Sequence, residues 1–181
     1  MPLMTGVEFR VMKFTKAAMA VLMMMMTGSG QTATTAMLTI NVTFTQPSCD
    51  IKVPASYNLG VLTPGEKVHA PLDITWTCKG NTPVKTALTA AIVKGSLSGD
   101  EKVILQTDGG SNTGVTLSLR EKVSNKLIKL TGPTAGGFFC SDTSAISGVM
   151  RTCLLTPETN VSQSGSFGSV SATLRFEVGY P

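Results

Sequence analysis

Apolar and polar residues alternate with a period of two along most of the chain after residue 36. Three clear runs of this kind lie in its middle, at 72–78, 84–92 and 115–120. Since successive side chains of a strand point to opposite faces, each run predicts a β-strand with one buried face. No helical pattern with a 3.6-residue period extends over three turns here.

Turn-forming residues separate these runs. Lys79-Gly80-Asn81, Asp108-Gly109-Gly110 and Gly132-Pro133 each follow an apolar stretch. Several short strands at such spacing are typical of an antiparallel β-sandwich. We find no internal repeat and no Gly- or Pro-rich linker, so the sequence indicates one all-β domain.

The N-terminal segment has the three parts of an export signal. Residues 12–16 form a short segment with two lysines, residues 17–26 are continuously apolar, and a stretch of small and polar residues follows. Ten apolar residues are too few to span a bilayer, and small residues at 34 and 36 suit a signal peptidase. We therefore predict a signal peptide over residues 1–36, within which Met12 is a second candidate for the first residue.

Export changes the expected chemistry of the four cysteines, Cys49, Cys78, Cys140 and Cys153. Disulfides persist outside the cytoplasm, and no CxxC spacing favours zinc or redox chemistry. Four cysteines allow three pairings. We expect Cys49 to pair with Cys78 and Cys140 with Cys153, because each bond then closes a local loop.

Composition argues against other function classes. The net charge is +4 for 181 residues, but residues 37–181 carry 12 positive and 10 negative side chains, without a basic run longer than two, which does not favour nucleic-acid binding. A single histidine disfavours a multi-His metal site. The residues from which a hydrolase triad can be assembled on paper are His69, Asp142, Ser144 and Ser147. We expect no catalysis, no cofactor and no metal.

Both ends of the mature chain alternate as well. Near the predicted cleavage site the apolar positions are Leu38, Ile40, Val42 and Phe44. At the other end they are Val170, Ala172, Leu174, Phe176, Val178 and Tyr180. Each pattern predicts a strand.

Taken together, these features resemble the subunits of chaperone–usher pili, the fimbriae of Gram-negative bacteria. In that family a glycine fourteen residues from the end precedes an alternating strand with a penultimate tyrosine. Here Gly168 and Tyr180 occupy these positions. An alternating extension leads into Cys49, and Cys78 matches the usual partner of that cysteine.

The resemblance implies a six-stranded, incomplete immunoglobulin-like β-sandwich over residues 47–181, missing its last strand. A periplasmic chaperone would first supply the missing strand, and a neighbouring subunit would supply it in the fibre. An outer-membrane usher would assemble the subunits on the cell surface. The implied function is structural and supports adhesion, with neighbouring subunits as partners and a host receptor as a further one.

The resemblance also assigns residues. Residues 37–46 would form the donor strand, and its inserted side chains would be Leu38, Ile40, Val42 and Phe44. Gly168, the apolar residues from Val170 to Tyr180, and Pro181 would form the strand beside the groove that the chaperone engages. Cys49–Cys78 would clamp the first strand beside that groove.

Two departures from the family remain. Family donor strands carry a glycine seven residues before the first cysteine, where this chain has Val42. Either the groove accommodates valine, or the extension inserts in another register. The additional pair Cys140 and Cys153 brackets a segment suited to a receptor site. The alternative function is therefore a single-domain adhesin or tip subunit that binds a host glycan or protein.

Overall fold

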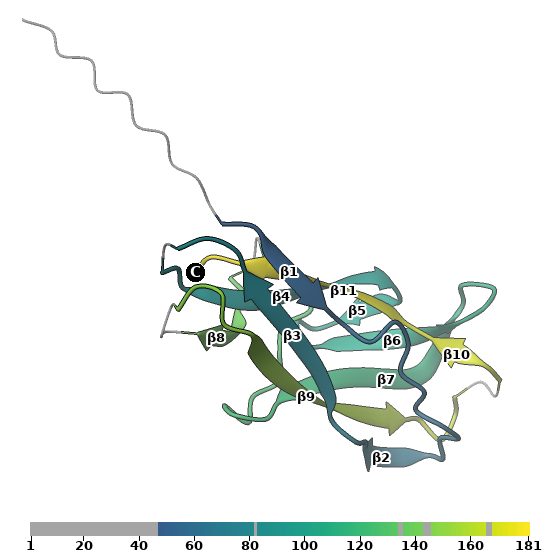
Figure 1. Cartoon of the computed structure of the whole chain (residues 1–181). Coiled ribbons are helices and arrows are strands. Elements are labelled where there is room, and N and C mark those ends of the chain that lie inside the picture. Colours follow the sequence, from purple (N-terminus) through teal and green to yellow (C-terminus); the bar gives the residue numbers. More distant parts are fainter. Residues whose placement is uncertain (1–46, 82, 134–135, 143–145, 166–167) are drawn as a thin grey trace, which may run out of the picture. The chain divides into compact units, whose positions relative to one another are not determined.

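The structure, a computed structural model, describes residues 47–181 apart from 82, 134–135, 143–145 and 166–167. These residues form two antiparallel β-sheets (Figure 1). The larger sheet contains β1 (Cys49–Lys52), β2 (Gly65–Val68), β3 (Leu72–Cys78), β5 (Ser96–Ser98), β6 (Lys102–Thr107), β7 (Asn112–Glu121), β9 (Arg151–Val161) and β10 (Val170–Ser171). The smaller sheet contains β4 (Thr86–Lys94), β8 (Phe139–Asp142) and β11 (Thr173–Gly179).

The order of the strands leaves β1 at one end of the larger sheet and β11 at one end of the smaller sheet. The larger sheet runs β1-β3-β9-β7-β6-β10, with β2 paired to β9 and β5 to β6. The smaller sheet runs β11-β4-β8. No α-helix occurs among the described residues, and hence none there that is long and apolar enough to cross a membrane.

The core lies between the two sheets and takes side chains from both. Ile74, Trp76 and Leu155 come from the larger sheet, and Leu88 and Phe139 from the smaller one; all five are buried. Burying such a side chain contributes roughly 1.5–3 kcal/mol. These contacts hold the two sheets together as a sandwich, as the alternating sequence predicts.

The alternation predicted for two of the runs is found in the structure. Apolar residues of 72–78 point into the core from β3. In β7, Val115 and Leu119 are buried and Leu117 packs half-buried against the core, but Ser118, expected on the outer face, is buried as well. In β4 the pattern is less regular, because Ala87 and Thr89 are buried as well as their neighbours. β4 is the middle strand of a three-stranded sheet, which shields its small outward side chains.

Among the described residues the structure has eleven strand segments, β1 to β11, where the resemblance implies six strands. Pro157 lies in the interior strand β9 and lacks a backbone N–H. Its carbonyl oxygen accepts a hydrogen bond from His69 N at 2.9 Å, between the end of β2 and the start of β3. The ladder along this side of β9 is therefore interrupted where proline has no donor, which separates β2 from β3.

Candidate functional site: two strand edges beside the core

The strands β1 and β11 lie next to each other, each with one unpaired edge. β1 pairs with β3, and β11 pairs with β4. In the part of the chain that the structure describes, neither pairs with a second strand. Figure 1 shows them side by side, where the two sheets meet. An unpaired edge presents backbone N–H and C=O groups to which another strand can add.

The apolar side chains of these two strands are only half-buried. β11 contains no fully buried residue, although Leu174, Phe176 and Val178 pack against the core. The same holds for Cys49 and Ile51 on β1. The apolar side chains of β1 and β11 are thus covered by the core on one side and accessible to solvent on the other, as expected where a strand of a sandwich is missing.

The edge strand β2 contrasts with this arrangement. All four of its residues are exposed, and it carries Glu66 and Lys67. Charged, exposed residues protect a sheet edge against unwanted pairing. β11 also carries an exposed ion pair, Arg175–Glu177, but its alternate residues Leu174, Phe176 and Val178 are apolar and only half-buried.

Aromatic side chains form one wall of the site. The rings of Phe176 and Phe139 meet edge to face, with centroids 6.5 Å apart and an interplanar angle of 81°. Gly179 lies against Phe138, because a Cβ atom at Gly179 would approach Phe138 Cε1 to 2.7 Å. The sequence reasoning missed Gly179, Phe138 and Ile51; the Gly-Tyr-Pro ending was the signal for the first.

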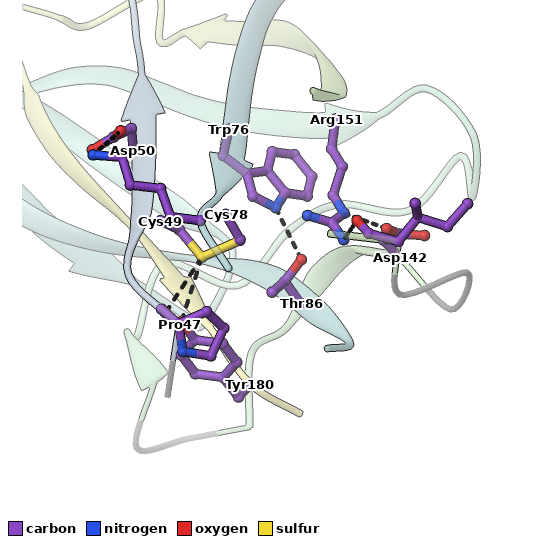
Figure 2. Close-up of a disulfide and its surroundings, with 11 residues drawn as sticks. Pro47, Cys49, Asp50, Trp76, Cys78, Thr86, Asp142, Arg151 and Tyr180 are labelled. Atoms are coloured by element: carbon purple, nitrogen blue, oxygen red, sulfur yellow. Dashed lines mark hydrogen bonds and ion pairs between the residues drawn. A yellow bond between two sulfur atoms is a disulfide. The ribbon is translucent and has the colours of Figure 1, made fainter. Parts of the chain in front are cut away.

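A tyrosine joins the ends of β11 and β1, next to a disulfide that joins β1 to β3. Cys49 and Cys78 face each other across β1 and β3 and are disulfide-bonded, as expected. The Tyr180 hydroxyl donates a hydrogen bond to the carbonyl of Pro47 and lies 3.4 Å from Cys49 Sγ (Figure 2). We call this region, residues 47–49, 78–80 and 179–180, the Pro47 end.

The second disulfide, Cys140–Cys153, also has the expected pairing. It links β8 to β9, and Arg151 lies two residues before Cys153. The Arg151 guanidinium is nearly buried and forms an ion pair with Asp142 (Figure 2). It also donates a hydrogen bond to the carbonyl of Ile146 at 2.8 Å. Disulfide and ion pair together fix both ends of the bracketed segment.

The remaining predicted site residues fall as follows. Gly168 has φ +137°, a conformation that side chains rarely adopt, and precedes β10. Val170 lies in β10 and pairs with Thr107 of the larger sheet, Ala172 marks the crossing to the smaller sheet, and Pro181 is exposed. The donor residues Leu38, Ile40, Val42 and Phe44, and the signal segment, lie outside the described residues.

The structure does not assemble the possible hydrolase triad. His69 Nε2 lies 2.8 Å from Thr159 Oγ1 at one end of β9. Asp142 pairs with Arg151 at the other end, and eight residues of strand span about 26 Å. Ser144 lies outside the described residues. Partial burial, together with the nearby Lys67 charge, lowers the pKa of His69.

Comparison with known structures relates this fold to pilus proteins. The P pilus rod subunit PapA is similar with a TM-score of 0.52 at 20% identity, over 74% of this chain and 99% of that one. A chaperone–usher pilus structure on rod uncoiling is similar with a TM-score of 0.53 at 15% identity, over 82% and 97%. No protein-family model and no curated protein sequence matches the chain. The chain thus has the incomplete immunoglobulin-like fold of pilus subunits.

Proposed function

We propose that this chain is a structural subunit of a chaperone–usher pilus that polymerises by strand donation. Residues 1–36 direct export, residues 37–46 insert into a neighbouring subunit, and residues 47–181 form the body that accepts a strand. The observation that carries the proposal is the pair of unpaired edges, β1 and β11, with half-buried apolar side chains between them. The fold shared with PapA supports it.

The assignment of partners follows from this site. In the periplasm, a chaperone strand occupies the β1–β11 edges until an outer-membrane usher exchanges it for a neighbour's extension. In the fibre, Leu38, Ile40, Val42 and Phe44 cover Leu174, Phe176 and Val178 of the neighbour. Main-chain hydrogen bonds supply the pairing, and alternate side chains fix the register. The assembled fibre lies on the cell surface and supports adhesion.

A peptide experiment tests this function directly. Oxidised protein comprising residues 47–181 is melted with and without a peptide of residues 37–46. A ligand that binds only the folded state raises its melting temperature, so the peptide increases the Tm by many degrees. The matched control is the same peptide with Ile40→Asp and Phe44→Asp, which leaves the Tm unchanged because charges cannot enter the apolar site.

The opposite results point to other functions. A body that melts cooperatively at high temperature and ignores the peptide is a complete sandwich, and the subunit proposal is then wrong. A body of low stability that responds to neither peptide accepts its strand from another protein. A Val42→Gly peptide tests the two possibilities given above for Val42. If this peptide binds more weakly than the unaltered peptide, the site accommodates valine.

A further inference from the structure

Three exposed apolar side chains gather beside the point where the extension leaves the body. Ile146, Val149 and Met150 are 57%, 50% and 64% exposed. Exposed apolar side chains scattered singly need no explanation, but here three occur within one five-residue segment. We call this set the 146–150 face.

The 146–150 face is fastened to the Pro47 end. Gly148 N donates to the carbonyl of Cys78 at 3.1 Å, and Cys78 is disulfide-bonded to Cys49. The carbonyl of Ile146 accepts a hydrogen bond from the buried Arg151. These bonds hold the backbone between Ile146 and Met150 in place, so the apolar side chains are displayed on a fixed support.

The length of the connecting chain brings a neighbour to this place. If Phe44 inserts into another subunit, as proposed above, three residue steps join it to Pro47. Fully extended, three steps reach about 10 Å. Pro47 is itself held by the Tyr180 hydroxyl. The neighbour's body must therefore lie within about 10 Å of the Pro47 end, to which the 146–150 face is fastened by the hydrogen bond from Gly148 N to the carbonyl of Cys78.

We infer that the 146–150 face is a contact surface between successive subunits of the fibre, occupied by the body of a second copy of this chain. This inference rests on the proposed function. A complete sandwich pairs its last strand antiparallel to the strand beside it, here β11. Phe44, the inserted residue nearest Pro47, therefore lies beside the start of the neighbour's β11. The end of the neighbour that carries β10 then faces the 146–150 face.

The sequence supplies a native probe for this contact. Met150 is the single methionine among the described residues, and hydrogen peroxide oxidises methionine according to its exposure. Val68 on the β2 edge is 67% exposed, close to the 64% of Met150. The variant Val68→Met therefore places a methionine of matched exposure on a strand away from the Pro47 end, in the same molecule.

The experiment oxidises polymers of the Val68→Met chain, with its extension present, and follows both positions by peptide mass spectrometry. We expect Met150 to oxidise roughly fivefold or more slowly than the introduced methionine, because the neighbour covers it. Adding Val149→Asp to the same chain should bring the Met150 rate close to that of the introduced methionine. The Tm increase produced by peptide 37–46 should not change, since Val149 lies outside the β1–β11 edges.

Equal oxidation at both positions in polymers overturns the contact and leaves the face open, as a receptor site requires. A chain that forms no polymers overturns the strand-donation proposal, and with it this inference. Polymers in which Met150 is slow and Val149→Asp restores its rate support both. The two failures are therefore distinguishable by whether polymers form.

Discussion

At the level of single residues, a few polar side chains fix the end of the molecule from which the extension leaves. Trp76 Nε1 donates to Thr86 Oγ1 at 3.0 Å inside the core, so the indole is buried without an unpaired donor. Arg151 on β9 lies opposite Trp76 on the neighbouring strand β3, and Arg151 is 8% exposed. A charge so nearly buried is tolerated only with a partner, here Asp142.

Replacing Arg151 by methionine should destabilise the protein. Arg151→Met keeps the volume of the side chain but leaves the Asp142 carboxylate without this cation and the Ile146 carbonyl without this donor. Breaking a buried ion pair costs about 3 kcal/mol, measured as the free energy of unfolding in urea. The control is Arg151→Met with Asp142→Asn, which should recover part of the loss; an additive double variant would mean that the pair does not interact.

His69 should make the stability depend on pH in a known direction. Burial and the Lys67 charge lower the pKa of His69 in the fold from its ordinary value of 6.5. The unfolded chain therefore takes up a proton at this histidine more readily than the folded protein does. The contribution of neutral His69 to stability is fully present above pH 6.5 and is lost as the pH falls from 6.5 toward the lowered pKa of the folded protein. His69→Gln should show a smaller Tm difference between about pH 7.5 and 5.5. An unchanged difference would assign the pH dependence to other groups.

At the level of elements, the two disulfides have different surroundings. Cys49–Cys78 joins β1, one of the two strands with an unpaired edge at the site, to β3, whereas Cys140–Cys153 joins β8 to β9 and includes neither β1 nor β11. Each disulfide restricts the unfolded chain, which stabilises the folded protein by roughly 3 kcal/mol for loops of this length. Their effects on strand binding should therefore separate.

Removing each pair by double substitution to serine tests this difference. Both double variants should lower the Tm by about 10 °C, as expected for a loss of ~3 kcal/mol in a domain of this size. The variant Cys49→Ser with Cys78→Ser should also bind peptide 37–46 more weakly in calorimetry, because β1 is no longer clamped beside β11. Equal affinity in both variants would show that the clamp does not shape the site.

Much of the fold and of the site can be predicted from the sequence because burial on one face imposes a period of two. The runs that contain Trp76 and Leu174 show that period, and β3 and β11 form there. The opposite wall could not be predicted from pattern, because β1 has four residues and a single aliphatic side chain, Ile51. The division of β2 from β3 depends on Pro157, 88 residues after His69, and so on tertiary pairing that local sequence does not contain.

At the level of the whole molecule, the direction of the inserted strand decides whether a chain can complete itself. Tyr180 lies at the Pro47 end, and the start of β11 lies beside β10 at the other end. The seven residues of β11 extend about 23 Å. A donor antiparallel to β11 places Phe44 at the far end, which the three residue steps to Pro47, about 10 Å, cannot reach. Antiparallel donation therefore requires a second copy.

Donation between copies in one direction gives open chains, since the two surfaces in contact differ and the rotation between subunits need not close. A chain with Ile40→Asp and Phe44→Asp can accept a strand but cannot donate one. Added to the unaltered chain, it should end each growing polymer, so the mean length measured by light scattering should fall as its fraction rises. A Val61→Asp chain, altered at an exposed residue of the body, is the matched control. If the extension instead completed its own subunit, parallel to β11, the donor variant would leave the size distribution unchanged.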